Sequence, residues 1–281
     1  MSENFFHLKP EFIENDPRKN RPVTIKGPVT AEFMSLQQSI LLPPELIKGK
    51  RILDLGACLA ASGAWVLSHG ATFYKGVEFE SAFSDSAKEA MARYYADDQF
   101  EIVCDSIENY LDQEEEKFDV VIAAGVLHVF SNPLEVLRTI ARRSDALVIE
   151  SAHSVTFQKT RFLNDALKES LLQSSDYEPF IENEPFIEIG QEGMTVPGEK
   201  TLLFKGLRLS MGAVKATMQE EGFAYVDDIN QTLKKLLPKM YSPYRRYGAL
   251  FLREERLSEA NDFGFLGASS SGTDQKIIKW Q

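Results

Sequence analysis

The feature that most constrains the fold is a run of small residues directly after an apolar strand. Residues 52–55 have the pattern of a buried strand. Five of the next eight residues have little or no side chain: Gly56, Ala57, Ala60, Ala61 and Gly63. A strand-to-helix turn of this kind lets a ligand lie against the backbone, and the free amides of the next helix favour an anionic group. The alternative is a tightly packed turn that binds nothing.

A second strand follows at the spacing of one βαβ unit. Residues 73–78 are expected to form this strand, and Glu78 at its end lies 24 residues after Asp54 (78 − 54). Such a unit places a carboxylate at the tip of its second strand, where the carboxylate can accept the protons of both ribose hydroxyls. We therefore expect Glu78 to bind a ribose and the adjacent Phe79 to cover an adenine.

These two motifs resemble the class I, Rossmann-like methyltransferases that use S-adenosylmethionine, and the resemblance covers most of residues 50–150. It implies an α/β fold: a mostly parallel seven-stranded sheet with an antiparallel C-terminal hairpin and helices on both faces. Nucleotide dehydrogenases share the acid but usually have Gly-x-Gly-x-x-Gly, which the sequence from Gly56 to Ala61 lacks. The methyltransferase glycine pattern is also incomplete, because Cys58 and Ala60 stand at its later glycine positions.

The resemblance implies S-adenosylmethionine as the cofactor and assigns ten residues to it: Asp54, Gly56, Ala57, Cys58, Glu78, Phe79, Asp105, Ser106, Ala124 and Gly125. Asp105 ends a predicted third strand, where the family holds the adenine amino group with an acid and the next amide meets the ring. Residues 118–130 are a β-branched run that is expected to form the fourth strand and then a small-residue loop. A helix is expected at 132–140 and a fifth strand at 145–150. Strands that alternate with helices through short loops predict a parallel sheet covered by helices.

Two histidines are the candidate catalytic residues. Methyl transfer needs a general base only when the acceptor carries a proton of high pKa. His128 follows the predicted fourth strand, and His153 follows the fifth, so both are expected at the ligand-binding edge of the sheet. Glu150 is placed to orient either histidine, and all three also fit a role as pocket lining. No group of His, Cys and acidic residues has the spacing of a metal site.

The flanking regions are expected to select the acceptor. Residues 1–49 form an N-terminal cap with a packed helix around Phe33, Leu36 and Ile40, and residues 50–256 form the methyltransferase domain. A long insertion at about 151–209 is predicted to be a substrate lid, and residues 257–281 a flexible tail.

Two short repeats lie inside this insertion, Glu178–Glu182 and Glu184–Glu188. Each has the sequence Glu-Pro-Phe-Ile-Glu. We expect extended edge segments, because proline limits ladder hydrogen bonds. These segments either form a wall of the substrate pocket or serve only to pack the insertion.

The last part of the domain is expected to hold a helix at 210–221 and a hairpin of residues 224–229 and 247–253. The loop between these two strands is basic and rich in tyrosine: Lys234, Lys235, Lys239, Tyr241, Tyr244, Arg245, Arg246 and Tyr247. It can meet an anionic substrate, although a solvated run of charge is the commoner explanation.

Composition limits the possible partners but does not identify the substrate. The formal net charge of −11 weighs against broad binding to nucleic acid, and no apolar run is long enough to cross a bilayer. Two cysteines and no cationic, apolar leader favour a cytoplasmic location. Our hypothesis is transfer to an oxygen or nitrogen of a small or medium-sized soluble molecule, and a homodimer is left open. The alternatives are an enzyme that modifies the tRNA wobble uridine, and a scaffold protein that binds the cofactor without catalysis.

Overall fold

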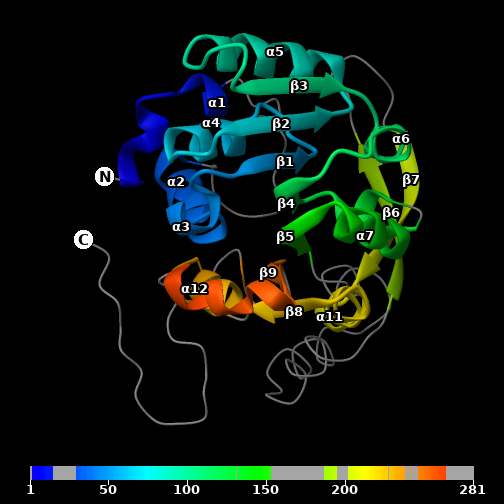
Figure 1. The fold of residues 1–281 in the computed structure, drawn as a ribbon. Helices are drawn as coiled ribbons and strands as arrows, with labels where there is room; N and C mark the ends of the chain where they lie inside the picture. The colour runs from blue at the N-terminus through cyan, green and yellow to red at the C-terminus, as the bar shows by residue number, and fades with distance from the viewer. Residues whose placement is uncertain are drawn as a thin grey trace, which may run out of the picture.

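The computed structural model describes residues 2–14, 30–130, 132–152, 187–194, 202–226, 228–237, 241 and 246–263. These residues build a seven-stranded sheet in the order β3-β2-β1-β4-β5-β9-β8 (Figure 1). The five neighbours at one side are parallel: β1 (Arg51–Leu55), β2 (Phe73–Glu78), β3 (Phe100–Cys104), β4 (Phe118–Ala124) and β5 (Ser144–Ala152).

The last two strands close the sheet as an antiparallel hairpin. β9 (Arg246–Arg253) lies between β5 and β8 (Phe223–Val226) and is antiparallel to both. The predicted fold class is therefore confirmed: the sheet is mostly parallel and ends in an antiparallel hairpin.

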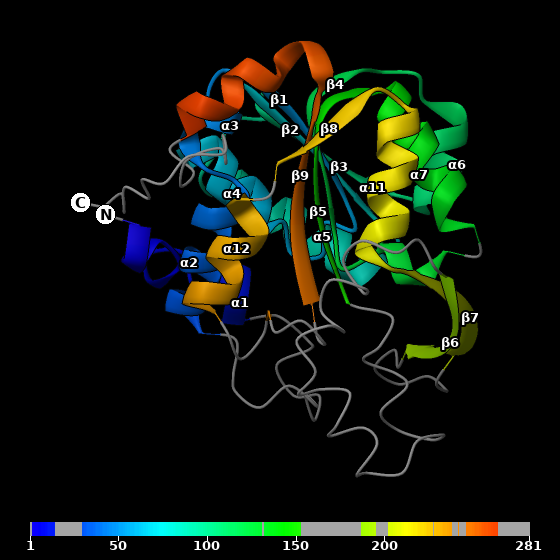
Figure 2. The ribbon, with the colours of Figure 1, turned by 90° about the horizontal axis from the view of Figure 1, so that it is seen from below.

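Helices cover both faces of this sheet. On one side Figure 2 shows α6 (Ile107–Gln113), α7 (Pro133–Arg142) and α11 (Met211–Glu220), and on the other α2 (Ala31–Leu41), α4 (Ala61–Ser68) and α12 (Asp228–Leu236). The shorter or more peripheral helices are η1 (Ser2–His7), α1 (Glu11–Glu14), α3 (Pro44–Ile47), α5 (Ser81–Ala92), η3 (Leu127–Val129) and η4 (Glu254–Phe263).

The core consists of two layers because side chains alternate along each buried strand. In β1, Ile52 packs in the layer that holds Trp65 of α4, whereas Leu53 packs in the layer that holds Leu137 of α7. Both layers are well sealed, since Ile52 is 0% exposed and Leu53 is 1% exposed. A sheet buried on both faces explains why its strands are nearly continuous apolar runs.

The N-terminal segment packs on the α4 side of the sheet. The helix predicted around Phe33, Leu36 and Ile40 is α2, which begins at Ala31 after the cap Thr30. The Thr30 side chain accepts a hydrogen bond from the Phe33 amide at 3.2 Å. Residues 15–29 lie outside the described part of the chain.

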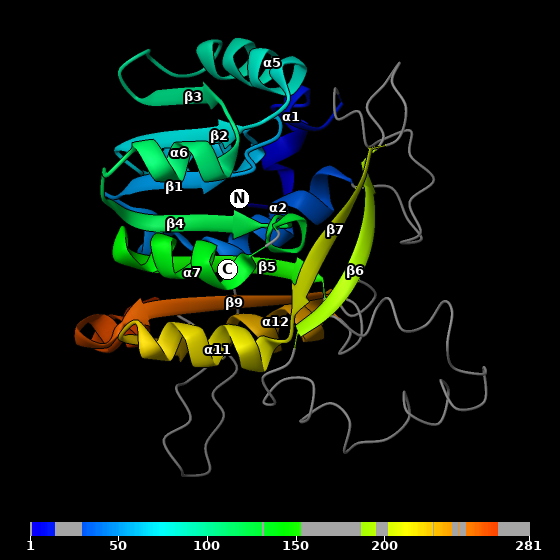
Figure 3. The same ribbon diagram turned by 90° about the vertical axis from the view of Figure 1, so that its right-hand side faces the viewer.

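A second, two-stranded sheet comes from the insertion after β5. β6 (Ile187–Met194) and β7 (Leu202–Leu209) pair antiparallel, and β7 contacts η3, the short helix that carries His128 (Figure 3). Of the two predicted repeats, only Ile187 and Glu188 fall among the described residues, within β6. Figure 3 shows β4 and β5 pointing toward the side where this hairpin lies.

Two expectations about the C-terminal region need correction. The segment between β8 and β9 is not only a loop, because residues 228–236 form α12, which carries Lys234 and Lys235 in its last turn. Tyr241 and Tyr247 are fully buried and belong to the core instead of a substrate-facing surface. Lys239, Tyr244 and Arg245 lie outside the described residues. The tail predicted from residue 257 is structured as η4 as far as Phe263.

Candidate cofactor site

The turn after β1 keeps a glycine-like backbone even where glycine is absent. Gly56 has φ +82°, and Cys58 and Ala60 have φ +51° and +57°. L-residues rarely adopt this left-handed region, where the side chain crowds the following carbonyl. Cys58 and Ala60 stand at the later glycine positions of the predicted motif, so the incomplete pattern preserves the conformation that the glycines would supply.

Backbone hydrogen bonds fix this turn against β2. The amides of Gly56 and Ala57 both donate to the Val77 carbonyl, at 2.9 and 3.0 Å. A Cβ on Gly56 would clash with Val126 Cγ1, so only glycine fits between the turn and the loop after β4. The end of β2 and the loop that follows β4 therefore pack tightly against this turn.

Glu78 is anchored at the end of β2. Its carboxylate accepts hydrogen bonds from the Cys58 amide at 2.8 Å and from the Glu80 amide at 3.0 Å, one on each oxygen. An ionised carboxylate has about four acceptor positions, so two remain for the hydroxyls of a ribose. The side chain predicted to hold the ribose is thus oriented by the same turn that is predicted to hold the rest of the cofactor.

Asp54 is buried beneath this turn. Its Oδ2 accepts a hydrogen bond from the Tyr74 hydroxyl at 2.9 Å and another from the Ser62 hydroxyl of α4. Burial raises the pKa of Asp54 to about 6, and the nearby charge of Glu78 also raises it, while the bonds from Ser62 and Tyr74 act in the opposite direction. Asp54 therefore connects β1 to α4 and β2 and supports the turn from below.

The residues predicted to meet the adenine lie together at the ends of β2 and β3. Glu78 pairs with Cys104 in register, and the Asp105 amide donates to the Glu78 carbonyl at 3.1 Å. The Phe79 side chain is 63% exposed, which leaves its ring open to a ligand. Asp105 Oδ1 accepts from the Ser106 amide at 2.7 Å, and Ser106 caps α6.

Ala124 and Gly125 come at the end of β4, next to a buried ion pair. The Gly125 amide donates to the Glu150 carbonyl at 2.6 Å, and Gly125 has φ +75°. The Glu150 carboxylate accepts two hydrogen bonds from Arg246 of β9. Glu150 was expected to orient His128 or His153; among the described residues, which do not include His153, its carboxylate is bound by Arg246.

His128 lies on η3, just after β4, with an intermediate exposure. Its position at the carboxyl ends of the strands agrees with the prediction, and β7 packs against the same helix. His153 lies outside the described residues. Among the described residues, no group of three or more His, Cys, Asp or Glu side chains is arranged to hold a metal ion.

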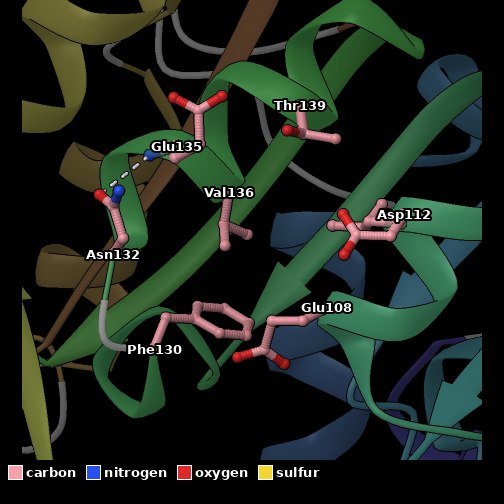
Figure 4. Close-up of a pocket in the computed structure, with 8 residues that line it drawn as sticks. Glu108, Asp112, Phe130, Asn132, Glu135, Val136 and Thr139 are labelled. Carbon is pink, nitrogen blue, oxygen red and sulfur yellow. Dashed lines mark hydrogen bonds between the residues drawn. The ribbon is translucent and has the colours of Figure 1, made fainter.

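A separate hollow of about 200 Å³ lies between α6 and α7 (Figure 4). None of the predicted cofactor or catalytic residues lines it; its lining residues are Glu108, Leu111, Asp112, Phe130, Asn132, Glu135, Val136 and Thr139. Asn132 caps α7 there, since its Oδ1 accepts from the Glu135 amide at 3.4 Å (Figure 4).

The fold is that of a known class. The strand order and the antiparallel hairpin match the Rossmann-like methyltransferase fold. Residues 53–144 match the family model described as a methyltransferase domain. The predicted resemblance to the methyltransferases that use S-adenosylmethionine is thereby confirmed for this segment.

Solved structures share the fold at low sequence identity. A protein of Listeria monocytogenes assigned as an S-adenosylmethionine-dependent methyltransferase is 12% identical, with a TM-score of 0.53, and the match covers 79% of this chain and 98% of that one. The N-terminal domain of EvdMO1, solved with SAH and D-fucose, is 16% identical, with a TM-score of 0.51, and covers 77% of this chain and 82% of that one. No curated protein sequence matches this chain.

Several residues of the site could not be found from the sequence. Ser62 and Tyr74 bind Asp54, and Gln37 and Tyr241 reach the neighbourhood of Glu150 from distant parts of the chain. Tyr74 looked like an ordinary strand residue, and Gln37 and Tyr241 are 204 positions apart. The pattern contains no local signal for such long-range contacts.

Proposed function

We propose that the protein transfers a methyl group from S-adenosylmethionine to an oxygen or nitrogen of a small soluble molecule. The observation that carries the proposal is the geometry of Glu78. Its carboxylate is fixed at the tip of β2 by the Cys58 and Glu80 amides, and the exposed ring of Phe79 lies beside it. The two ends of S-adenosylmethionine would thus be bound by neighbouring segments at the carboxyl ends of β1 and β2.

Each residue at this end of the sheet would bind a different part of the cofactor. The start of α4 would bind the methionyl carboxylate, because helix N-termini favour anions. The turn from Gly56 to Cys58, whose amides are already bonded to Val77 and Glu78, would lie against the cofactor. Glu78 would accept from the ribose, Asp105 from the adenine amino group, and Phe79 would cover the ring. Ala124 and Gly125 would line the side of the site nearest the acceptor.

Bound S-adenosylmethionine supplies a methyl group on a positively charged sulfur, ready for in-line displacement. The protein then has to hold the acceptor atom in line with that methyl group and to exclude water. The hairpin of β6 and β7 packs against η3 beside this edge, which supports a role of the insertion in covering the acceptor. His128 on η3 is the proposed base for an acceptor that must lose a proton.

The composition supports a small acceptor over a nucleic acid. The chain has a formal net charge of −11, and a polyanion would be repelled at long range. A cytoplasmic setting is part of the proposal, since both cysteines are free thiols. In the described part of the chain, no helix is long and apolar enough to span a membrane.

The ribose assignment is tested by Glu78→Ala. Loss of hydrogen bonds to a charged acceptor should weaken S-adenosylmethionine binding by about 1 to 3 kcal/mol, measured by isothermal titration. The exposed neighbour Glu89 serves as the control, because it lies on the surface of α5 and Glu89→Ala should leave the affinity unchanged. Equal affinities of Glu78→Ala and the parent protein would reject the assignment.

The base assignment is tested by His128→Ala. A base of ordinary imidazole pKa should make turnover fall toward low pH in the parent protein, and the variant should lose that dependence together with most of its rate. Retained turnover with saturating acceptor from pH 6 to 9 would dismiss the base role and leave His128 as a pocket residue.

Two other functions remain as alternatives, and one set of methyl-transfer assays separates them. A cofactor-binding scaffold would take up S-adenosylmethionine and release no S-adenosylhomocysteine with any acceptor mixture. An enzyme that modifies the tRNA wobble uridine would transfer a tritiated methyl group to bulk tRNA. Transfer of the label to a small-molecule extract, with none to tRNA, is the result that the proposal requires.

A further inference from the structure

A chain of polar side chains converges on Glu150 at the carboxyl end of β5. The Gln37 amide of α2 donates to the Tyr241 hydroxyl, and burial together with the nearby charge of Glu150 raises the pKa of Tyr241. Arg246 of β9 donates two hydrogen bonds to the Glu150 carboxylate, one to each oxygen. Three parts of the chain that are remote in sequence, around Gln37, Glu150 and Tyr241–Arg246, therefore lie close together here.

The chain of contacts is sealed from solvent. Tyr241 is fully buried, the Glu150 side chain is 4% exposed, and the Arg246 side chain is 22% exposed. Hydrogen bonds in such surroundings are strong, and an ionised group without partners there would be costly. The carboxylate of Glu150 is thus held by two hydrogen bonds from the Arg246 guanidinium, one to each oxygen.

This arrangement lies directly against Gly125 of the proposed site. The Gly125 amide donates to the Glu150 carbonyl, and a Cβ on Gly125 would lie 3.4 Å from Arg246 Nη2 and 3.9 Å from Glu150 Oε2. Gly125 has φ +75°, a conformation that glycine adopts without strain but that its neighbours must select. The guanidinium and the carboxylate form the wall on which this glycine rests.

A purely structural reading explains the network poorly. Replacing a buried ion pair by apolar side chains of similar volume is often neutral or stabilising, so such a pair is weak support for a stabilising role. A bidentate arginine fork offers directional geometry that apolar packing does not. The network also ends at the loop from Gly125 to His128, which joins the proposed cofactor site to the proposed base.

We propose that Glu150 and Arg246 are positioning residues, with Tyr241 and Gln37 as their support, which hold the Gly125 backbone in the geometry that the proposed methyl transfer requires. The proposal rests on the proposed function for the ligand that this loop binds. The contacts that hold the loop in place do not depend on that function. A consequence is that α2 of the N-terminal segment takes part in shaping the site.

The test compares two arginines at the two ends of the same strand. Arg246→Lys breaks the fork at the site. Arg253→Lys is the matched control, because Arg253 ends β9 and donates to the carbonyls of Ser144, Glu221 and Ala141, far from Gly125. Glu150→Gln is the isosteric partner variant: it fills the same volume, so a role in packing alone would leave it silent.

Two measurements are made on each variant: hydrogen–deuterium exchange of the peptide that spans residues 124–130, and affinity for S-adenosylhomocysteine. Arg246→Lys and Glu150→Gln should each speed exchange of this peptide by about ten-fold and weaken the affinity by about three- to ten-fold, because a charged hydrogen bond is lost. Arg253→Lys should leave both quantities at the parent values even if the protein becomes less stable.

The outcomes separate this inference from the proposed function. Unchanged exchange in Glu150→Gln and Arg246→Lys, or an equal change in Arg253→Lys, would overturn the positioning role. A parent protein that binds no S-adenosylhomocysteine would instead overturn the proposed function, while the exchange data would still test the positioning role. If Arg246→Lys fails to fold, Glu150→Gln alone gives the comparison against Arg253→Lys, because it changes the same ion pair from the other side.

Discussion

At the scale of single residues, the turn that follows β1 combines two unfavourable features. Cys58 and Ala60 adopt left-handed backbone conformations that glycine would adopt at lower cost, and Asp54 is a buried carboxyl directly below them. Strain and buried charge of this kind persist where the surrounding structure imposes them, and they gather at functional sites. Each feature gives a prediction that does not depend on the identity of the acceptor.

Asp54→Asn should change how stability depends on pH. The carboxyl of Asp54 in the unfolded chain loses its proton near pH 3.8, whereas in the folded protein its pKa is about 6. The folded state therefore binds more protons in this window, and the stability that this group contributes falls as pH rises through it. The asparagine variant lacks this loss, so its stability relative to the parent should rise by about 2 to 3 kcal/mol between pH 4 and pH 7.5.

The measurement is urea unfolding of both proteins at several pH values. A constant difference between the two proteins across this range would show that Asp54 does not titrate in the window. Asp119→Asn is the comparison variant. The Asp119 carboxylate accepts a hydrogen bond from the Arg51 amide at the amino ends of β1 and β4.

Cys58→Gly should relieve strain in the turn. A non-glycine residue in the left-handed region costs about 1 to 2 kcal/mol of stability. Glycine removes this cost, but its greater freedom in the unfolded chain offsets about 0.5 to 1 kcal/mol of the gain. The variant should therefore be more stable by up to about 1 kcal/mol. Ala216→Gly, on the exposed side of α11, is the control and should be less stable by about 1 kcal/mol. A loss of stability in Cys58→Gly would mean that the thiol contributes more packing than its backbone costs.

At the scale of elements, the pattern of the sequence was most informative where a strand is buried on both faces. All five parallel strands were predicted close to their observed positions, because each is a short apolar run bounded by polar or small residues. The start of α7 was also predicted, from the proline at its first turn.

α12 was missed for a physical reason. The stretch Val226-Asp227-Asp228-Ile229 reads as the end of a strand, because its apolar residues are β-branched. The helix is instead fixed by Ile229 and Leu233, which are four residues apart and fully buried against β9 and α2. The buried Tyr241 hydroxyl accepts a hydrogen bond from Gln37, 204 positions away, and a local pattern cannot predict that contact.

Ser210→Ala should weaken α11 more than a surface cap would. The Ser210 hydroxyl is buried and accepts a hydrogen bond from the Ala213 amide at 3.0 Å, which caps the helix. Loss of a cap costs about 0.5 to 2 kcal/mol, and the buried amide left without a partner puts this site near the upper end. Thr30→Ala, which removes the exposed cap of α2, should cost about 1 kcal/mol or less. Equal losses in urea unfolding would show that burial adds nothing to this cap.

At the scale of the whole molecule, the N-terminal segment is docked on the outer side of α4 and α5. Phe6 and Phe12 are buried there at 1% and 2% exposure, and Phe5 meets Trp65 edge to face at 5.3 Å between ring centroids. α2 then packs against α12 and β9, and its Gln37 reaches the network at Glu150. The segment is thus joined to the sheet domain at two places, one of them beside the proposed site.

Lys9 is the polar anchor of the first place. Its ammonium donates to the Tyr95 hydroxyl at 2.7 Å and to Ser68 at 3.2 Å, and it lies 4.3 Å from the centre of the Tyr94 ring. Burial lowers the pKa of Lys9, which shows that the charge is partly desolvated. A partly desolvated ammonium gains more from aromatic faces than an exposed one, about 1 to 2 kcal/mol. We expect this gain to exceed the cost of desolvation because the hydroxyls of Tyr95 and Ser68 replace two hydration contacts.

Lys9→Met keeps the aliphatic stem and removes the charge, so it isolates this contribution. Hydrogen–deuterium exchange over residues 2–14 should become about ten-fold faster, as expected for a loss of about 1.4 kcal/mol in local opening, whereas exchange in the β1 and β4 peptides should not change. Lys88→Met, on the exposed face of α5, is the control and should leave both regions as they are. Slower exchange over residues 2–14 in Lys9→Met would reverse the balance: the buried charge would then cost more than its aromatic and hydroxyl contacts return, and Phe6 and Phe12 alone would hold the segment in place.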